Sequence, residues 1–333
     1  MLSVNLVYGT YGESGILTSI NNTRRMLELL DPEVRLYENA PRICDVIHAH
    51  TFGPIALFLA LLHKAYRRVV VIHAHTTPQD VRSSYVAASF LSIFLRRYLK
   101  FYYNLADVCI APSLYTKDVL ITTLGVRRRI EVVSNGIDLN LYSCDQERAN
   151  TFRKRYAIGD RPLILSVGLV FMRKGIADFV EVARIFPEFQ FAWAGRILAS
   201  PFLPRRTREI LRNAPPNVLF TGRVENICDP LSAAQIFVFP SYEENQGIAV
   251  LEAAACSLPI VIRDLPVYTG YVHERDCIKF TSRRELAAAI QELVTNKTKA
   301  GLLGQNAREA VQKHDIRVIG RKLLRVYLSA KVR

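Results

Sequence analysis

Short apolar segments of strand length alternate with helical stretches along the whole chain. In the first half these segments are Leu2–Tyr8, Val46–Ala49, Val69–His73, Asp107–Ala111 and Ile130–Val133. In the second half they are Leu163–Val167, Phe189–Trp193, Val218–Phe220, Ile236–Phe239 and Pro259–Arg263. Strands that alternate with helices in this way are typical of parallel sheets covered by helices. The sequence therefore predicts an α/β protein.

The length predicts two domains, because 333 residues are too many for one ordinary hydrophobic core. We place the first domain at residues 1–158 and the second at residues 159–315. The boundary lies in the polar segment Cys144–Ala157, directly before a new strand. The last helix, Ile316–Lys331, is basic and amphipathic, and we expect residues 316–333 to join the first domain.

The cysteines and the apolar segments predict a cytoplasmic protein that does not span a membrane. The chain has 6 cysteines, which are scattered and form no Cys-x-x-Cys pair, as is typical of a reducing compartment. The N-terminal residues Leu2–Tyr8 form a strand rather than a signal segment. The longest apolar run, Pro54–Leu62, is far shorter than the roughly 20 residues of a membrane helix.

The segment Ile236–Ala255 contains two acids in a strand, turn and helix arrangement. A buried strand ends at Pro240, a polar turn contains Glu244, and a buried helix, Ile248–Ala255, contains Glu252. This arrangement points backbone N–H groups and a partial positive charge at an anion. Carboxylates also accept hydrogen bonds from sugar hydroxyls. The alternative is a solvated loop acid at Glu244 and a surface helix acid at Glu252.

A second strand, turn and helix unit contains two adjacent cations. Gly168–Gly175 follows a strand and includes Arg173 and Lys174 directly before a helix. Cations are unfavourable at a helix N-terminus unless an anion is bound there. Arg as a fork and Lys as a point charge would together bind a pyrophosphate.

The first strand is followed by a glycine-rich turn, Gly9–Gly15, and then by a helix. Glycine allows backbone to approach a ligand closely, so Gly15 is a candidate binding residue. The turn does not have the G-x-G-x-x-G pattern, and a plain connection between strand and helix is the alternative.

Four histidines lie at the ends of two of the predicted strands or directly after them: His48, His50, His73 and His75. Parallel sheets bind their ligands at the carboxyl ends of strands, so His75, with His73 behind it, is a candidate site residue. The histidines alternate within each turn and have no Cys or acidic residues beside them as further ligands. This pattern argues against zinc, and we predict no metal site.

Basic charge is concentrated in residues 54–103, which contain 7 basic residues and one acid in a chain of net charge +14. Within it, Ser89–Tyr103 combines basic residues with many aromatic ones, as interfacial helices on anionic bilayers do. A core helix with a basic outer face is the alternative. No recognisable nucleic-acid module is present, so we predict no nucleic-acid partner.

The motifs taken together resemble a known family. Gly168, Arg173-Lys174-Gly175, Ser241, Glu244, Gly247 and Glu252 resemble the retaining GT-B glycosyltransferases of family four with their E-x7-E motif. Leu169 departs from the family, which usually has Arg directly after the first glycine. Further stretches are similar to bacterial monoglucosyldiacylglycerol synthases: His73–Thr77, Arg82–Tyr85, Ser134–Asp138 and Arg263–Tyr268.

The resemblance implies a GT-B fold, with two Rossmann-like domains facing across a cleft. It implies that Arg173 and Lys174 hold the donor diphosphate, Glu244 the donor hexose and Glu252 the nucleotide ribose. Gly247 would let the turn approach the sugar, and His75 would meet it near the reacting carbon.

The reaction that the resemblance implies is retaining transfer of a hexose, glucose from UDP-glucose, with no tightly bound cofactor. The acceptor would be a membrane lipid such as diacylglycerol. The basic segment would hold the protein peripherally on the inner face of the cell membrane. Two alternatives stay open: the same chemistry on a soluble glycan or polysaccharide, and a non-catalytic GT-B membrane scaffold.

Overall fold

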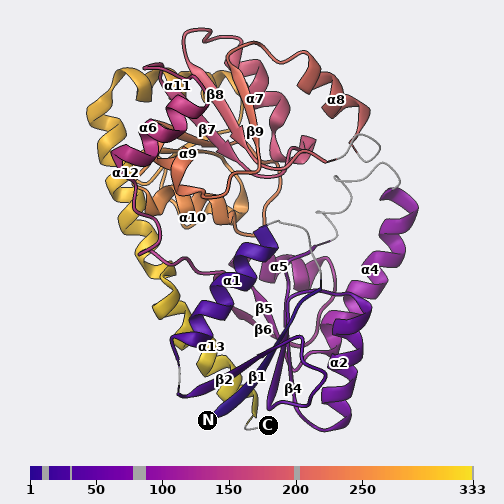
Figure 1. Ribbon diagram of the computed structural model, residues 1–333. Helices are drawn as coiled ribbons and strands as arrows, with labels where there is room; N and C mark the ends of the chain where they lie inside the picture. Colours follow the sequence, from indigo (N-terminus) through magenta and orange to yellow (C-terminus); the bar gives the residue numbers. More distant parts are fainter. Residues whose placement is uncertain (10–14, 31, 78–87, 199–202, 332–333) are drawn as a thin grey trace. The chain divides into compact units, whose positions relative to one another are not determined.

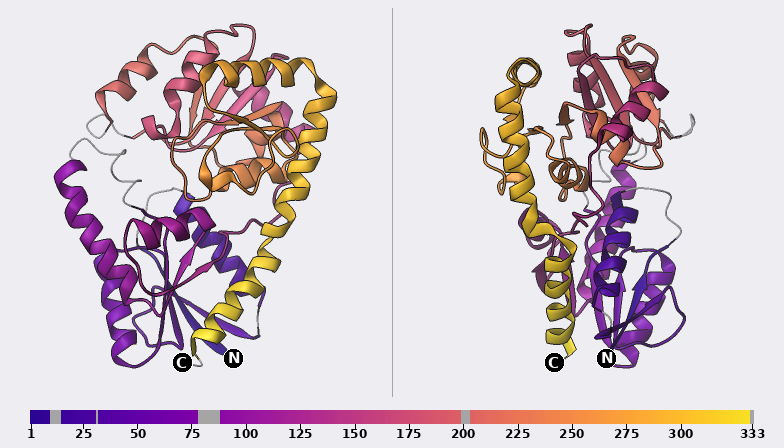
Figure 2. Two further views of the ribbon diagram at one scale, coloured as in Figure 1. Left: turned by 180° about the vertical axis from the view of Figure 1, so that it is seen from behind. Right: turned by 60° about the vertical axis from the view of Figure 1, so that its left-hand side comes forward.

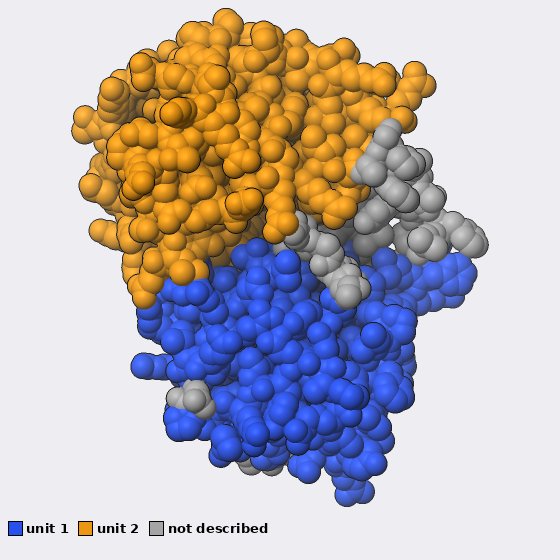
Figure 3. Space-filling model, viewed as in Figure 1, with its two compact units in different colours: residues 1–138, 313–333 blue, residues 139–312 orange. Residues whose placement is uncertain are grey.

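The computed structural model describes residues 1–9, 15–30, 32–77, 88–198 and 203–331, with the backbone alone for residues 88–92. It divides into two compact units (Figure 3). Unit 1 comprises Met1–Asp138 and Lys313–Arg333, and unit 2 comprises Leu139–Gln312. The last helix therefore belongs with the N-terminal residues.

The division falls at Asp138, whereas the sequence places the end of the first domain at residue 158. Much of the intervening polar segment forms a helix, α6 (Gln146–Arg155). This helix packs against α9 (Cys228–Ala233), and Arg153 Nη2 donates to the Ala233 carbonyl at 2.7 Å. The polar composition marks a solvent-facing helix of unit 2 rather than a connector.

Unit 1 contains one parallel sheet with the strand order β2-β1-β3-β4-β5-β6. Its elements in chain order are β1 (Leu2–Val7), α1 (Gly15–Glu28), β2 (Val34–Glu38), β3 (Val46–Ala49), α2 (Pro54–Ala65), β4 (Val69–His73), α4 (Ala88–Leu105), β5 (Val108–Ala111), α5 (Leu114–Thr122), β6 (Arg129–Val132) and α13 (Ile316–Lys331) (Figure 1). The order reverses between β1 and β3.

Both faces of this sheet are covered, as its continuous apolar strands require. Successive strand residues point to opposite faces, so Val70 and Ile72 pack with α2 and α4. Val69 and Val71 pack on the other face with α1 and α13. Figure 2 shows α13 lying along the sheet of unit 1.

Unit 2 contains a second parallel sheet, with the order β12-β11-β10-β7-β8-β9. Besides α6 and α9, its elements are β7 (Leu163–Val167), the 3₁₀ helix η1 (Met172–Lys174), α7 (Ile176–Ala183), β8 (Gln190–Ala194), α8 (Arg205–Arg212), β9 (Val218–Gly222), β10 (Ile236–Phe239), α10 (Ile248–Ala255), β11 (Ile260–Arg263), η3 (Pro266–Tyr268), β12 (Ile278–Phe280), α11 (Arg283–Thr295) and α12 (Lys297–Val311). This is the strand order of a Rossmann sheet, and the direction in which strands are added reverses between β7 and β10.

The predicted α/β class and the two Rossmann-like sheets are confirmed. Two edge strands, β2 and β12, were not predicted. Each is short and has partly exposed positions, so neither has the continuous apolar run by which the inner strands are recognised.

A buried carboxylate connects α7 to the strand ends of unit 2. Asp178 accepts hydrogen bonds from Arg263 Nη2 and the Tyr242 hydroxyl, both at 2.5 Å, and from Arg283 Nε. Burial raises the pKa of Asp178, but the bonds from Tyr242 and Arg283 and the charge of Arg263 outweigh it and hold that pKa below its ordinary value.

Asp178→Ala is expected to lower the free energy of unfolding by on the order of 3 kcal/mol, because it leaves buried Arg263 without its carboxylate. Since the folded-state pKa is lowered, this stabilisation is present at neutral pH and is lost as the pH falls and Asp178 takes up a proton. Urea unfolding at neutral and acidic pH measures both effects. Glu181→Ala, which removes an exposed acid of the same helix, is the control, and equal losses in the two variants would contradict the prediction.

Candidate active site

The two loops that the sequence singles out meet at the β7/β10 reversal in unit 2. Open α/β sheets bind their ligands at the carboxyl ends of the strands beside such a reversal. The Tyr242 N–H donates to the Arg173 carbonyl at 2.8 Å. Arg173 Nη1 donates in turn to the Glu243 carbonyl at 3.1 Å. The loops after β7 and β10 therefore form one surface.

Glycine is required at two points on this surface. Gly175 has φ of 80°, and a Cβ there would lie 2.2 Å from the Pro240 carbonyl oxygen. Gly247 has φ of 79°, and its Cβ would lie 2.5 Å from the Tyr268 hydroxyl. Both positions combine a left-handed backbone with no room for a side chain. Gly175 thus allows the close approach of the two loops, and Gly247 allows the β10–α10 turn to approach Tyr268 of η3.

Lys174 and Glu244 form an ion pair across the two loops. Their side chains are 16% and 9% exposed, so the pair is largely withdrawn from water. The Lys174 ammonium also lies over the Phe239 ring, 5.3 Å from its centroid. The alternative of a solvated acid at Glu244 is therefore wrong. A pair of this kind can separate when an anion takes the ammonium and hydroxyls take the carboxylate.

Glu252 lies in α10 and is buried, so the alternative of a surface helix acid is also wrong. The Tyr142 hydroxyl donates to Glu252 Oε1 at 2.9 Å. Burial raises the pKa of Glu252 more than this hydrogen bond lowers it, to about 7. Tyr142 was not predicted, because it lies in a segment that the sequence assigns to the other domain.

Two buried hydroxyls beside these residues were also not predicted as site residues. Ser241 follows β10, and Tyr268 ends η3 next to Gly247. In the part of the chain that the structure describes, neither hydroxyl has a hydrogen-bond partner. A buried hydroxyl without a partner is unfavourable, so both are candidates to bind a polar ligand.

The four histidines of unit 1 gather at the carboxyl ends of β3 and β4. His50 Nδ1 lies 2.8 Å from His75 Nε2, and the rings of His73 and His75 stack at 4.0 Å. His48 Nδ1 lies 2.7 Å from the Tyr327 hydroxyl of α13. His75 therefore has His50 as a direct neighbour, a partner that the sequence did not identify.

Burial keeps these imidazoles neutral. It lowers the pKa of His48 and of His75 to about 3, and it lowers the pKa of His50 and His73 as well. At neutral pH His75 therefore serves as a neutral hydrogen-bonding group rather than as a cation. One ring nitrogen from each of His48, His50 and His73 lies within 4.8 Å of the other two. The prediction that no metal is bound stays a prediction.

The other sequence candidates lie at the ends of elements or outside the described residues. Gly15 is the first residue of α1, and a Cβ there would meet none of the described residues within 4 Å. Packing against the described part of the chain therefore does not require glycine at this position. Most of the preceding turn, residues 10–14, and the stretch Arg82–Tyr85 lie outside the described residues.

The described part of the basic segment includes two neighbouring helices, α2 and α4, whose outer sides are both apolar and basic. Ile55 and Phe58 of α2 and Phe94 and Phe101 of α4 are all more than half exposed. Leu99, Tyr102 and Tyr103 of α4 are buried in the core. Helix α4 thus has the buried contacts expected of a core helix. It also has the exposed aromatic residues expected of an interfacial helix.

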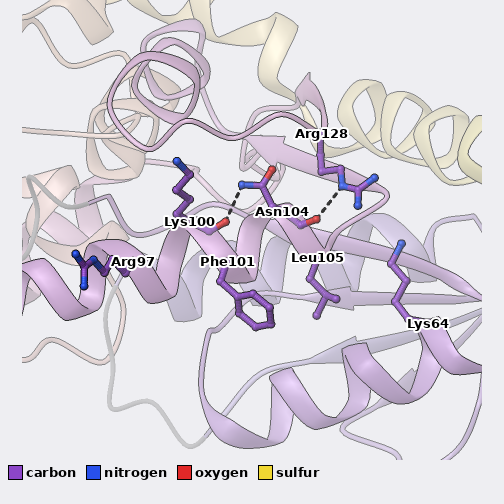
Figure 4. A pocket seen from close by; sticks show the side chains of 7 residues that line it. All are labelled: Lys64, Arg97, Lys100, Phe101, Asn104, Leu105 and Arg128. Carbon is purple, nitrogen blue, oxygen red and sulfur yellow. Dashed lines mark hydrogen bonds between the residues drawn. The ribbon is translucent and has the colours of Figure 1, made fainter.

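A cavity of about 700 Å³ lies on this side of unit 1 (Figure 4). Its lining residues are Lys64, Arg97, Lys100, Phe101, Asn104, Leu105 and Arg128. Arg128 Nε donates to the Asn104 carbonyl at 2.8 Å, and Lys64 pairs with Asp107. Four cations around one cavity make it a candidate site for an anionic group.

No helix within the described residues has both the length and the apolar character needed to cross a bilayer.

Comparisons with known proteins cover both units. The family model described as Glycosyltransferase Family 4 matches residues 14–141, and that described as Glycosyl transferases group 1 matches residues 148–310. The processive diacylglycerol alpha-glucosyltransferase of Acholeplasma laidlawii is 32% identical over 325 residues, which is 95% of this chain and 93% of that protein. The alpha-galactosylglucosyldiacylglycerol synthase of Streptococcus pneumoniae is 27% identical over 78% of this chain and 70% of that protein.

Solved structures share the fold at low sequence identity. Anabaena HepE in complex with UDP-glucose superposes with a TM-score of 0.80 at 19% identity, over 99% of this chain and 100% of that one. Sucrose-phosphate synthase from Thermosynechococcus elongatus gives a TM-score of 0.80 at 18% identity, over 99% of both chains.

Proposed function

We propose that this chain, which belongs to glycosyltransferase family four, transfers glucose from UDP-glucose to a hydroxyl of a glycerol lipid with retention of configuration. Family membership makes it a GT-B enzyme that uses a nucleotide sugar. Glucose, uridine diphosphate, the lipid acceptor and the stereochemistry are parts of the proposal. The Lys174–Glu244 pair at the β7/β10 reversal is the observation that carries it.

In the proposed donor site, the cations and the acids bind different parts of the nucleotide sugar. Arg173 and Lys174 bind the diphosphate, Glu244 binds the hexose hydroxyls, and Glu252 binds the ribose. When the diphosphate takes the Lys174 ammonium, the Glu244 carboxylate is released for the sugar. Gly247 brings the N-terminus of α10 close to the donor.

The proposed chemistry needs stabilisation of the departing diphosphate above all, because that group gains charge as the glycosidic bond breaks. Arg173 and Lys174 supply positive charge for it. His75 keeps the role that the family resemblance implies, contact with the sugar near the reacting carbon, as a neutral imidazole. The acceptor hydroxyl attacks from the side that the diphosphate leaves, without a protein nucleophile, and its proton passes to the departing diphosphate.

Donor choice and stereochemistry test the proposal directly. The protein is incubated with UDP-glucose, UDP-galactose or GDP-mannose and a diacylglycerol acceptor, and the anomeric proton of the product is assigned by NMR. An α-glucosyl lipid from UDP-glucose, itself an α-glycoside, is the expected result. A β-linked product would contradict retention, and a stronger reaction with another donor would contradict the assignment of glucose.

Glu252 gives the proposal a pH dependence. Two ribose hydroxyls need an ionised acceptor, and the pKa of Glu252 in the free protein is about 7. Affinity for UDP-glucose is therefore expected to be constant at alkaline pH and to fall roughly tenfold for each pH unit below that pKa. UDP-glucose suits calorimetry here because its diphosphate diester does not titrate near neutral pH.

Tyr142→Phe provides the matched variant for this measurement. The Tyr142 hydroxyl lowers the pKa of Glu252, so its loss is expected to move the midpoint of the affinity curve to higher pH. A flat curve in the wild type, or an unchanged midpoint in Tyr142→Phe, would remove Glu252 from the donor site.

We propose that the acceptor is reached from an anionic membrane surface, on which the outer sides of α2 and α4 dock. The exposed apolar residues would enter the interface while the cations around the cavity face the lipid phosphates. The names of the relatives from A. laidlawii and S. pneumoniae support a glycerol lipid as acceptor. The proposed location is cytoplasmic, peripheral on the inner face of the cell membrane.

Charge reversal on α4 tests the docking surface. Arg97→Glu with Lys100→Glu is expected to weaken binding to anionic vesicles roughly thirtyfold or more, since each cation near such a surface contributes about 1 kcal/mol. Cosedimentation with phosphatidylglycerol vesicles measures the change. The control is Arg284→Glu with Lys297→Glu, two exposed cations of unit 2. Equal weakening by both double variants would mean that net charge, not this surface, drives binding.

A further inference from the structure

Three thiols gather at the end of α10 in unit 2. Cys256 follows the last residue of that helix, and its thiol interacts with those of Cys144 and Cys228. Cys228 Sγ donates to the Leu141 carbonyl at 3.2 Å. The N–H of Asp145 donates to the Ser232 hydroxyl of α9 at 3.3 Å. The fold thus joins three segments that the sequence keeps far apart.

The cluster adjoins the buried hydrogen bond between Tyr142 and Glu252. The Cys256 N–H donates to the Glu252 carbonyl at 3.2 Å, one helical turn along α10. Cys144 lies two residues after Tyr142 in the sequence. Cys144 and Cys256 therefore follow the two partners of that hydrogen bond closely along the chain. A covalent link between them would act directly on the position of Glu252.

The two thiols differ in reactivity. Cys144 is exposed, whereas Cys256 is buried. The neighbouring Cys256 thiol lowers the pKa of Cys144 more than burial raises it, and Ser232 and the Arg308 charge lower it further. Arg308 is held in place by its hydrogen bond to the Ala255 carbonyl. Cys144 is thus the more accessible of the two thiols and the one that loses its proton more readily, so it reacts first with an oxidant.

We propose that Cys144 and Cys256 form a reversible disulfide that weakens nucleotide binding; the effect on binding rests on the proposed function. The Cys144 thiol loses its proton, and the thiolate attacks an oxygen of a hydroperoxide; the O–O bond breaks, a sulfenic acid forms, and the departing oxygen takes up that proton and leaves as water or an alcohol. The Cys256 sulfur then attacks the Cys144 sulfur, the S–S bond forms, and the hydroxyl leaves as water with the Cys256 proton. The two cysteines are oxidised and the peroxide is reduced. A dithiol reverses the reaction.

Intact mass and peptide mapping test the bond itself. The full-length protein is treated with hydrogen peroxide, and its remaining thiols are blocked with iodoacetamide. We expect a mass lower by about 2 Da before blocking, two protected thiols, and a linked peptide pair containing Cys144 and Cys256. Dithiothreitol should restore the original mass. Six thiols still open to alkylation after unfolding, or a link between Cys228 and Cys256, would overturn the assignment.

Calorimetry with UDP tests the consequence. The oxidised protein is expected to bind UDP about tenfold more weakly than the reduced protein, as for the loss of one hydrogen bond to the ligand. Cys144→Ser should bind UDP normally and lose the response to peroxide, whereas Cys228→Ser should keep it. Equal affinity before and after oxidation would overturn the effect on binding. Failure of the reduced protein to bind UDP would contradict the proposed function instead, since mass and mapping report on the disulfide alone.

Discussion

Glu244→Ala is expected to lower kcat for hexose transfer by about a hundred- to a thousandfold, the loss found when one preorganised group is removed from the transition state. The carboxylate lies between the two loops that form the proposed donor site, and its side chain is only 9% exposed. Its removal takes away the group that would orient the sugar over the departing diphosphate. Initial rates at saturating UDP-glucose measure the effect.

Two further variants separate chemistry from folding in this experiment. Glu244→Gln keeps the size of the side chain and removes its charge, so it is expected to fold normally and to transfer slowly. Glu181→Ala removes an exposed acid and should transfer at the wild-type rate. Circular dichroism and the unfolding midpoint check the fold of each variant. Wild-type turnover in Glu244→Ala would contradict the assignment of the β10–α10 turn as the donor site.

Lys174→Ala is the second variant with a large expected effect. Loss of the ammonium is expected to lower kcat about a hundredfold or more, because charge develops on the diphosphate as the bond breaks. Affinity for UDP should fall as well. Lys174→Arg keeps the charge in a planar group of different shape, and we expect it to restore only part of the activity.

The ion pair adds a quantitative test. In the free protein Lys174 and Glu244 bind each other, so each single variant also leaves its partner uncompensated. The Lys174→Ala, Glu244→Ala double variant should therefore be more stable than the sum of the two single losses predicts. Lys297→Ala, at an exposed position of α12, is the control for Lys174→Ala. Additive stability losses, or unchanged kcat in Lys174→Ala, would contradict this account.

Much of the fold follows from the sequence because its inner strands are buried on both faces. A run such as Ile236–Phe239 is apolar at every position, and only a covered parallel strand or a buried helix requires that. Helix α10 was also predicted with its observed bounds, Ile248–Ala255. The edge strands β2 and β12 lack this signal, since partly exposed positions interrupt their apolar pattern.

The candidate site was predicted where its residues are close together in the sequence. Glu244, Gly247 and Glu252 belong to one strand, turn and helix unit, so their relation follows from the spacing. Tyr142 reaches Glu252 from 110 residues away, and His50 reaches His75 from 25 residues away. Contacts of this kind depend on the strand order, which local patterns do not encode. The cluster of Cys144, Cys228 and Cys256 was not predicted for the same reason.

The central claim is transfer of glucose from a nucleotide donor to a membrane lipid. Its most direct test is incubation of the wild-type protein with radiolabelled UDP-glucose and diacylglycerol in mixed micelles, with and without anionic lipid. The account predicts label in a glucosyl lipid, and more of it when anionic lipid is present. Release of free glucose without a labelled lipid, label only in an added soluble glycan, or no consumption of the donor would contradict it.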